Sequence, residues 1–307
     1  MNNPRAETAE CAAVADEHSR PTAVSLIVPA FNEEGAISAQ IAALMAVMDR
    51  SGRPYELIIV DDGSTDRTAE EARRHPVRLI QFSMNRGYGT ALKAGVAAAA
   101  HEWILITDAD GTYPVEAIPE MLARAGEYDM VVGARIGEHV NIPLPRRPAK
   151  WFLGRLASYL AEQPIPDLNS GLRVIRKSLV DQYEHLLPSG FSFTTTITMA
   201  LLANNYRVFY HPIDYHKRVG ASKLRPRAAY DFLLLILRTV VYFNPLRVFL
   251  PLGAVFFLVG MAKFVYDVFL WNLSENAVMF ILSAVILWAV GLLADQISRV
   301  GLALKSK

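Results

Sequence analysis

Two short apolar runs, each ending in a pair of aspartates, constrain the fold of this chain more than any other feature. Residues 57–60 lead into Asp61 and Asp62, and residues 103–107 lead into Asp108 and Asp110. Runs of this length are typical of buried strands, and ligands of open α/β sheets bind outside the carboxyl ends of the strands. Asp108 and Asp110 alternate along an extended chain, so the pattern indicates one oxygen-coordinated ion of the Mg²⁺ or Mn²⁺ type between their carboxylates.

The same organisation extends from residue 24 to residue 133. Short apolar runs occupy residues 24–28, 57–60, 77–82, 103–107 and 130–133, and helix-like spacing occupies residues 37–48, 68–74, 88–100 and 115–125. Alternation of this kind predicts βαβ units and a mostly parallel sheet. Residues 134–225 are less regular, with helical spacing at 146–162 and 194–204 and a short strand expected at 171–175.

Composition excludes several classes of function. The formal net charge of +1 over 307 residues gives no basic field for nucleic acid. Cys11 is the only cysteine, so a disulfide framework and a thiolate metal cluster are both excluded. The histidines are scattered, and no arrangement with serine, cysteine or aspartate for nucleophilic catalysis can be argued. Residues 1–22 carry acidic residues without an apolar core segment, which predicts a disordered leader rather than a secretory signal.

The apolar residues are concentrated after residue 231. Residues 232–243 are nearly all apolar apart from Arg238 but are too short to cross a bilayer, so an amphipathic helix in the membrane interface is expected. Residues 248–270 and 277–294 are long enough to span a hydrocarbon core of ~30 Å. Lys263 and Asp267 lie four residues apart in the first span, where they can pair, or Lys263 can snorkel to the interface.

The charges around the two spans predict their orientation. The turn at 271–276 contains no lysine or arginine, whereas basic residues flank the opposite ends of both spans. The positive-inside rule therefore places both termini, and the α/β region before the spans with them, on the cytoplasmic side of a multi-pass protein of the inner membrane. The alternative is a hairpin buried in a soluble core.

Seven polar motifs follow one another between and after the apolar runs. They are VSLIVPAFNEE at residues 24–34, VDDGSTD at 60–66, NRGYGTALKAG at 85–95, DAD at 108–110, GAR at 133–135, DLNSGLR at 167–173 and RVGASK at 218–223. In this order they resemble family 2 glycosyltransferases of the GT-A fold, most of all dolichol-phosphate mannose synthases and bacterial polyprenyl-phosphate glycosyltransferases. The resemblance covers about residues 22–300.

The resemblance implies a domain order. A disordered leader at 1–22 precedes a GT-A catalytic domain at 23–225, which is Rossmann-like with a mostly parallel sheet. A juxtamembrane amphipathic helix at 226–245, a two-helix transmembrane hairpin at 247–296 and a cytoplasmic tail at 297–307 follow.

It also implies an activity. A sugar is transferred with inversion, and with the help of Mg²⁺ or Mn²⁺, from a nucleotide-diphosphate sugar (a UDP-sugar or GDP-mannose) to a polyprenyl phosphate, undecaprenyl or dolichyl. The transfer takes place at the cytoplasmic membrane face and feeds cell-envelope glycan or glycosylation pathways. The implied partners are donor, acceptor and membrane lipids, without nucleic acid, and the oligomeric state, a homo-oligomer included, stays open.

Donor-binding residues carry over from the resemblance by position. Pro29, Phe31 and Glu33 match the first nucleotide-contacting loop, and Val60 and Asp62 match the strand end that contacts the base. Asp62 is chemically suited to accept a hydrogen bond from a ring N–H. Its alternative role is the N-cap of a helix over residues 66–74.

The metal motif carries over to Asp108, Ala109 and Asp110, of which Asp110 is the expected direct ligand. The ion neutralises the diphosphate leaving group as the glycosidic bond breaks. Mannose synthases usually carry glutamine where this chain has Thr112. A hydroxyl can bind the metal or a metal-bound water, but this departure puts mannose specificity in doubt. The alternative is two carboxylates in an ordinary loop.

Arg135 and Asp167 complete the expected catalytic set. Arg135 follows a strand end, where the family has an arginine on its catalytic face, and can contact a phosphate through two hydrogen bonds. The family's aspartate at the position of Asp167 faces the acceptor and has been proposed as a base. A lipid phosphate is already anionic at neutral pH, so orientation of the acceptor or of Arg173 is an equal alternative.

Three basic or glycine-rich segments have two interpretations each. Arg218, Ser222 and Lys223 match a loop that closes over the diphosphate, or they bind anionic lipid headgroups. Residues 146–152 combine basic and aromatic side chains, which either form an entrance for the lipid phosphate or lie on a solvated helix face. Residues 87–89 bring backbone N–H groups to a phosphate, or they form a turn that requires positive φ.

Two other functions compete with transfer to a lipid phosphate. A membrane-tethered transferase of the same family can act on a lipid or polysaccharide hydroxyl, which requires a definite base. A non-catalytic membrane scaffold of the same fold has no need for the convergent carboxylates and cations described above.

Overall fold

The computed structural model describes residues 22–140, 155, 158–159, 163–190, 192–215, 245–271 and 274–303, and the side chains of 137–140 and 299–303 are not included. The expected interfacial helix at 226–245, most of the expected helix at 146–162, and Arg218, Ser222 and Lys223 lie outside these residues.

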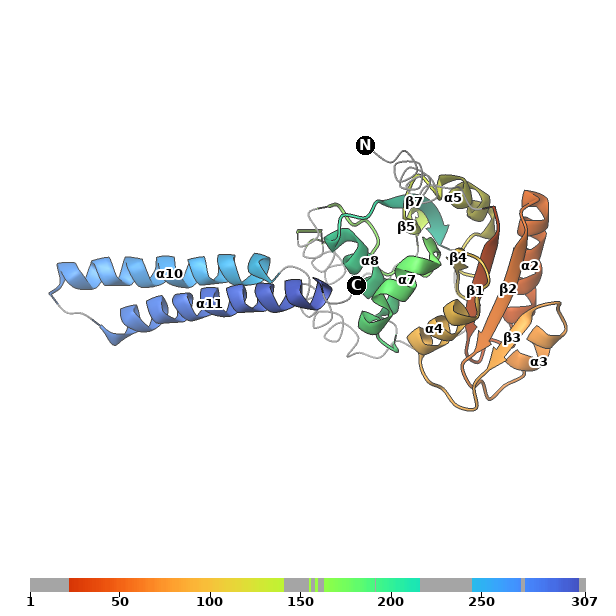
Figure 1. The fold of residues 1–307 in the computed structure, drawn as a ribbon, viewed down its shortest axis with the longest axis horizontal. Coiled ribbons are helices and arrows are strands. Elements are labelled where there is room, and N and C mark those ends of the chain that lie inside the picture. The colour runs from red at the N-terminus through yellow and green to blue at the C-terminus, as the bar shows by residue number, and fades with distance from the viewer. Residues whose placement is uncertain are drawn as a thin grey trace, which may run out of the picture.

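One seven-stranded sheet forms the centre of the domain that precedes the two C-terminal helices (Figure 1). Its strands are β1 (Val24–Ala30), β2 (Tyr55–Asp61), β3 (Arg78–Gln81), β4 (Trp103–Ile106), β5 (Met130–Val140), β6 (Arg173–Arg176) and β7 (Val208–Tyr215), in the order β3-β2-β1-β4-β6-β5-β7. The neighbours β1, β2, β3 and β4 pair in parallel, as do β5 and β7, and β6 alone runs antiparallel to both of its neighbours. The expected mostly parallel sheet is confirmed.

Helices cover both faces of this sheet. Strand residues alternate between two apolar clusters, so that Leu57 and Ile59 point to one face and Ile58 and Val60 to the other. The first cluster lies under α2 (Ile37–Ser51), α3 (Thr68–Arg73) and α5 (Ile118–Arg124), and the second under α4 (Tyr88–Ala98), α7 (Lys177–Tyr183) and α8 (Phe193–Ala203). Burial on both faces explains why the strands read as continuous apolar runs in the sequence.

The chain turns from strand to helix at the carboxyl ends of β1, β2 and β4. Because these strands are parallel, the loops that leave them meet at one edge of the sheet. Two short 3₁₀ turns, η1 (Val115–Ala117) and η3 (Glu184–Leu186), lead into α5 and out of α7. The sheet thus brings the aspartate-ended runs together, as a ligand site requires.

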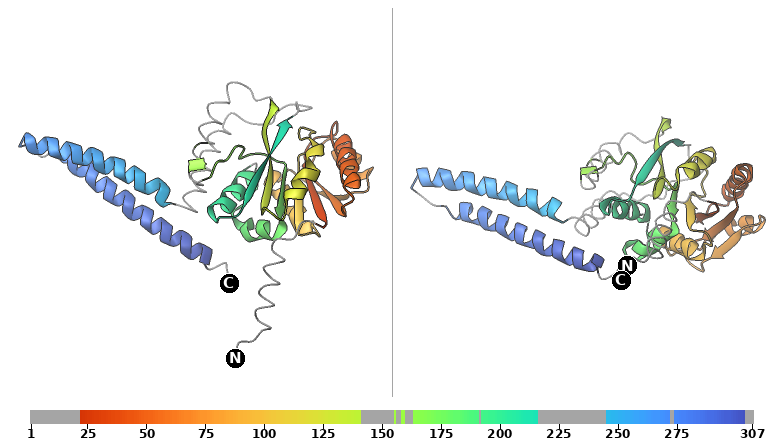
Figure 2. Two further views of the ribbon diagram at one scale, coloured as in Figure 1. Left: turned by 90° about the horizontal axis from the view of Figure 1, so that it is seen from above. Right: turned by 45° about the horizontal axis from the view of Figure 1, so that its top comes forward.

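Two long apolar helices form a hairpin that projects away from the sheet (Figures 1 and 2). The helices are α10 (Leu246–Phe269) and α11 (Glu275–Ala303), with mean hydropathies of 2.1 and 2.6 in their most apolar stretches. Length and composition are sufficient for both to cross a membrane. Only 11% and 17% of these stretches are buried inside the protein, which does not fit a hairpin in a soluble core.

Small residues hold the hairpin together. The buried positions recur every seven residues: Gly253, Gly260 and Asp267 on α10, and Ala277, Ala284, Gly291 and Ser298 on α11. This is the period of a left-handed helix pair, and small side chains let two helices approach closely in a membrane. A Cβ added at Gly253 would lie 2.4 Å from Trp288 Nε1.

The expected pairing inside the first span is confirmed, and it has a further partner. Lys263 Nζ donates to Asp267 Oδ1 at 2.6 Å, and Asp267 Oδ2 accepts the Ser274 backbone N–H at 3.0 Å. Asp267 therefore connects the last turn of α10 to the start of α11, which explains how a charged pair is accommodated near the tip of an apolar hairpin.

Candidate active site

The loops after β1 and β2 are fixed to each other by hydrogen bonds between side chains and backbone. Asn32, whose φ of 54° is left-handed, accepts the Thr65 N–H through Oδ1 at 2.8 Å. Ser64 Oγ accepts the Asn32 N–H at 2.9 Å, and Thr68 Oγ1 accepts the Glu33 N–H at 2.8 Å. Glu33 therefore stands on a rigid double loop at the carboxyl edge of the sheet.

The other predicted donor contacts differ in their exposure. Phe31 is partly exposed beside Glu33, whereas Pro29 and Val60 are buried within the paired strands β1 and β2. The Val60 side chain packs in the apolar cluster under α4, close to Gly95. Val60 thus supports the strand end and does not bring its side chain to the surface of the site.

Asp62 is buried and holds the loop that precedes α4. Its Oδ1 accepts the Arg86 N–H at 2.7 Å, and its Oδ2 accepts the Gly87 N–H at 2.9 Å. The alternative role of Asp62 as a helix N-cap is wrong, because α3 begins after Arg67 and it is Asp66 that accepts the Thr68 N–H, at 3.0 Å. Burial would raise the pKa of Asp66, but hydrogen bonds from Thr68 and Glu34 hold that pKa below its usual value.

Asp108 lies between a tyrosine and a glycine. The Tyr88 hydroxyl donates to Asp108 Oδ1 at 3.0 Å. A Cβ added at Gly171 would lie 2.8 Å from Asp108 Oδ2 and 2.9 Å from Oδ1, and the Gly171 N–H donates to the Tyr113 hydroxyl at 2.6 Å. Burial raises the pKa of Tyr88 well above its usual value, so its hydroxyl is protonated and acts as a donor at neutral pH.

Asp110 is buried and is bound by Thr112. The Thr112 hydroxyl donates to Asp110 Oδ1 at 2.6 Å, and the Thr112 N–H donates to the same oxygen at 3.2 Å. Thr112 therefore orients the carboxylate, while Ala109 packs in the core between the two aspartates. Within the described ranges, His, Cys, Asp and Glu side chains form no group of three or more that could hold a metal ion.

Arg135 and Asp167 form a two-point ion pair. Arg135 Nε and Nη2 donate to the two carboxylate oxygens of Asp167 at 2.6 and 2.9 Å, and the Arg135 backbone N–H donates to Oδ2 at 3.1 Å. The Asp167 side chain is fully buried and that of Arg135 is 18% exposed. Burial disfavours the charged guanidinium, but the hydrogen bonds to Asp167 raise the pKa of Arg135 above its usual value.

Two tyrosines extend this ion pair toward the metal motif. The Arg135 guanidinium lies 5.1 Å from the centre of the Tyr215 ring, in a cation–π contact. Tyr215 makes an edge contact with Tyr113, with ring centres 5.4 Å apart. Tyr113 therefore connects the surroundings of Asp108 to those of Arg135.

Arg173 is fully buried, and its hydrogen bonds give it a structural role. It donates to the Thr194 carbonyl and to Thr198 Oγ1, both at 3.0 Å, and to the Ser170 carbonyl at 3.2 Å. These bonds attach α8 to the segment that carries Asp167. Desolvation by burial lowers the pKa of Arg173.

The glycines at the start of α4 form a turn and do not present a phosphate site. Gly87 has a φ of 97°, and the N–H groups of Gly89 and Thr90 donate to the Ser189 carbonyl at 2.8 and 3.2 Å. A backbone carbonyl thus occupies the end of the helix. Lys93 binds the Glu184 carbonyl at 3.0 Å, which makes it a surface contact between α4 and η3.

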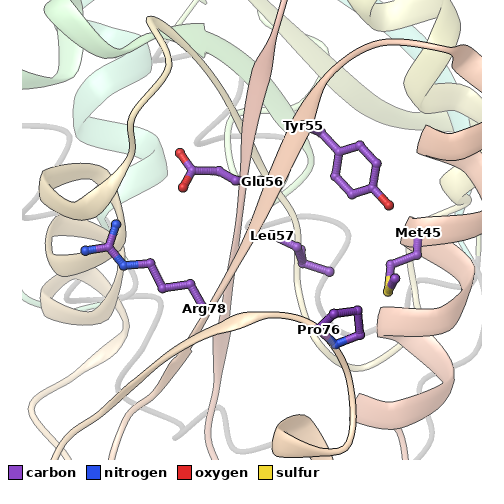
Figure 3. Close-up of a pocket in the computed structure, with 6 residues that line it drawn as sticks. All are labelled: Met45, Tyr55, Glu56, Leu57, Pro76 and Arg78. Atoms are coloured by element: carbon purple, nitrogen blue, oxygen red, sulfur yellow. The ribbon is translucent and has the colours of Figure 1, made fainter.

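A shallow hollow of about 350 Å³ lies elsewhere on the domain (Figure 3). It is lined by Met45, Tyr55, Glu56, Leu57, Pro76 and Arg78. Tyr55 begins β2 and Arg78 begins β3, so the hollow lies at the amino ends of these strands. Ligands of open α/β sheets bind at the opposite edge, where Asp62 and Asp108 lie.

Sequence reasoning missed Tyr88, Tyr113, Gly171 and Tyr215. All four stand within four residues of a predicted site residue or inside a quoted motif, and that proximity is the signal that the sequence offers. Their partners come from distant parts of the chain, which spacing alone does not reveal.

Comparisons with known proteins agree with this geometry. Residues 25–184, just over half of the chain, match the family model described as glycosyl transferase family 2, and residues 244–300 match one described as a GtrB C-terminal hairpin. A dolichyl-phosphate hexose transferase of Haloferax volcanii is 34% identical over 67% of this chain and 88% of its own length. An undecaprenyl-phosphate 4-deoxy-4-formamido-L-arabinose transferase of Edwardsiella ictaluri is 29% identical over 90% of this chain and 89% of its own.

A solved structure supports the fold. Glucosyl-3-phosphoglycerate synthase from Mycobacterium tuberculosis, in complex with Mn²⁺, uridine diphosphate and phosphoglyceric acid, superposes with a TM-score of 0.58. It shares 18% sequence identity over 74% of this chain and 82% of that one. The expected GT-A fold is therefore confirmed, with an additional apolar hairpin after it.

Proposed function

The chain belongs to glycosyltransferase family 2 and is a glycosyltransferase, and from this premise we propose that it transfers a sugar from a nucleotide-diphosphate sugar to a polyprenyl phosphate. The observation that carries the choice of acceptor is the Asp167 carboxylate, which is bound at both oxygens by Arg135. A carboxylate in a charged pair with a buried guanidinium is a poor base. An acceptor that is already an anion needs no base, whereas a hydroxyl acceptor does.

The relatives and the hairpin support the same acceptor. Two relatives that align with most of this chain are named for dolichyl-phosphate and undecaprenyl-phosphate substrates. The catalytic domain is followed by two helices long and apolar enough to enter the membrane in which such lipids reside. The basic residues around the hairpin support a cytoplasmic position for the catalytic domain and both termini.

We assign the donor side to the loops after β1 and β2. Phe31 and Glu33 lie on the rigid double loop, where they are placed to contact the nucleotide of a UDP-sugar or GDP-mannose. Asp62 fixes the loop before α4 by accepting two backbone N–H groups. Each carboxylate oxygen can accept a further hydrogen bond, and we propose that Asp62 accepts one from an N–H group of the nucleotide base. Arg218, Ser222 and Lys223 are proposed to close over the diphosphate.

Asp108 and Asp110 suit a divalent ion of the Mg²⁺ or Mn²⁺ type. Both are hard oxygen donors on one strand end, and Thr112 fixes the orientation of Asp110. A protein usually supplies one or two carboxylate ligands to such an ion, because the phosphates of the substrate supply further ligands. When bound, the ion supplies neutralisation of the charge that builds on the departing diphosphate.

Arg135 is proposed to bind the acceptor phosphate, held in place by Asp167. In the reaction, a phosphate oxygen of the lipid forms a bond to the anomeric carbon while the bond from that carbon to the nucleoside diphosphate breaks. The bonding electron pair leaves with the nucleoside diphosphate, and no proton has to move. Attack from the face opposite the leaving group inverts the anomeric configuration.

The test uses the full chain purified in detergent. A panel of UDP- and GDP-sugars is offered with Mn²⁺ and either undecaprenyl phosphate or undecaprenol, and the lipid products are identified by mass spectrometry. We expect one donor to give a glycosyl phospholipid whose mass increases by one sugar residue. Transfer to a hydroxyl lipid in preference to the phosphate contradicts the acceptor assignment, and the absence of any transfer supports the scaffold alternative.

A further inference from the structure

The Asp108 carboxylate has contacts on two sides that a loop carboxylate does not ordinarily have. Tyr88 donates to Oδ1 at 3.0 Å, and a Cβ added at Gly171 would lie 2.8 Å from Oδ2, 2.9 Å from Oδ1 and 3.0 Å from Cγ. One oxygen therefore accepts a hydrogen bond, and the backbone of Gly171 packs against the carboxylate group as a whole. Together they restrict the rotation of the carboxylate about its Cβ–Cγ bond.

The backbone around Tyr88 is fixed on both sides of the residue. The N–H of the preceding Gly87 donates to Asp62 at 2.9 Å, and the N–H of the following Gly89 donates to the Ser189 carbonyl at 2.8 Å. A Cβ added at Gly89 would lie 2.1 Å from the Pro188 carbonyl oxygen, which leaves α4 no room to shift toward that loop. The backbone from which the Tyr88 side chain extends is therefore held in place.

We propose that Tyr88 is a positioning residue for Asp108, which it holds in the orientation that binds the divalent ion. The proposal rests on the proposed metal role of Asp108. Carboxylates that bind metals are commonly held by hydrogen-bond donors behind them, and loss of such a donor typically costs ~10–100-fold in metal affinity. The phenyl ring of Tyr88 keeps its place without the hydroxyl, so Tyr88→Phe removes the donor alone.

The experiment measures Mn²⁺ binding by electron paramagnetic resonance on the full chain in detergent. Wild type, Tyr88→Phe and Asp108→Asn are titrated with Mn²⁺ in the presence of the nucleoside diphosphate of the donor selected above. Tyr183→Phe is the matched control, since Tyr183 is a buried tyrosine of the same apolar cluster that ends α7 and packs against Tyr206. Nucleotide binding without metal and thermal melting are measured beside it.

We expect Tyr88→Phe to weaken Mn²⁺ binding by at least ~10-fold, with metal-free nucleotide affinity and melting temperature close to those of Tyr183→Phe. In turnover, the Mn²⁺ concentration for half-maximal rate rises more than kcat falls. Gly171→Ala should weaken Mn²⁺ binding in the same direction, because its methyl group displaces the Asp108 carboxylate.

Two results would overturn the inference, and they differ in scope. Unchanged Mn²⁺ affinity in Tyr88→Phe, with loss of affinity in Asp108→Asn, removes the role of Tyr88 and leaves the metal site in place. Unchanged affinity in both variants removes the proposed metal role of Asp108 as well.

Discussion

At the scale of single residues, the site consists of carboxylates that are each held by a specific donor. Thr112 binds Asp110, Tyr88 binds Asp108, and Arg135 binds Asp167. Such fixed groups lose little conformational freedom when substrate binds, and preorganised charge is the largest single contribution in many enzymes. The geometry therefore favours electrostatic stabilisation of a leaving diphosphate over base catalysis.

Asp110→Ala should remove most of the transfer activity and leave the fold intact. The proposed ligand lies at a strand end, and loss of an electrostatic stabiliser of this kind typically lowers the rate by ~10²-fold or more. Turnover with Mg²⁺ and Mn²⁺ and the circular dichroism spectrum are measured together. Near-normal turnover of a folded Asp110→Ala protein contradicts the metal assignment.

Asp167→Asn should destabilise the protein as well as lower its activity. Removing one partner of a buried ion pair typically costs about 3–5 kcal/mol, because the remaining charge is left without compensation. Arg135 is mostly buried, and in Asp167→Asn its guanidinium loses the compensating negative charge and one of the two oxygens that accept its hydrogen bonds. The free energy of unfolding is measured by denaturant titration for Asp167→Asn, Arg135→Met and the double variant. We expect the loss of stability in the double variant to be clearly smaller than the sum of the losses in the two single variants. Additive costs contradict the coupling.

At the scale of elements, most strands and helices could be predicted from the sequence, whereas α7, β7 and the ends of several other elements could not. The apolar runs at 57–60 and 103–107 lie in or overlap β2 and β4, because both faces of those strands are covered. By contrast, β5 extends to Val140, beyond the expected end at residue 133, because it pairs with β7 through a register shift after Arg135. Pairing between strands so distant in sequence leaves no local pattern.

The site could be predicted in part for the same reason. Asp62, Asp108 and Asp110 follow strand ends, and parallel topology brings strand ends together. The expectation that Arg135 follows a strand end is wrong, because β5 continues through Arg135, which pairs with Ile213 of β7. The pairing of Asp167 with Arg135 depends on β6 running antiparallel to its neighbours. The contact of Tyr88 with Asp108 depends on the Ser189 carbonyl, which binds the start of α4. Those contacts are tertiary, so spacing along the chain does not encode them.

Gly253→Leu should weaken the packing of α10 on α11. A Cβ at this position would overlap Trp288, whose indole N–H also donates to the Leu250 carbonyl at 3.1 Å. Overpacking of a close contact typically costs about 1–3 kcal/mol. The control is Val255→Leu, on the same helix with 57% of the side chain exposed. Thermal melting in detergent, followed by helix circular dichroism, should separate the two variants, and equal melting contradicts the packing.

At the scale of the whole molecule, a complete sheet domain precedes an apolar hairpin (Figure 2). The seven strands pair with one another, and neither α10 nor α11 contributes to the sheet. The described contacts between the two parts include a hydrogen bond from Arg247 Nη1 to the Tyr159 carbonyl at 2.9 Å. We therefore expect the sheet domain to carry out the transfer and the hairpin to present the proposed lipid acceptor.

Deletion of residues 231–307 should leave a soluble domain that still binds the donor nucleotide. Transfer to polyprenyl phosphate in vesicles should fall steeply, because membrane attachment raises the effective concentration of the acceptor. Transfer to a short-chain, water-soluble prenyl phosphate should be retained and serves as the control. Full activity of the truncated protein on vesicle-embedded acceptor contradicts the proposed role of the hairpin.

The most direct test of the proposed acceptor compares undecaprenyl phosphate with undecaprenol across pH. Full chain in detergent is given the donor identified above, and the initial rate with each lipid is measured between pH 5 and pH 9 for wild type and Asp167→Asn. A phosphate monoester loses its second proton near a pKa of ~6. We predict that the rate with the phosphate rises through that ionisation and then levels off, with the same profile shape and a lower plateau in Asp167→Asn, and that undecaprenol is not a substrate. Transfer to undecaprenol, with a rising pH limb that disappears in Asp167→Asn, would contradict the account.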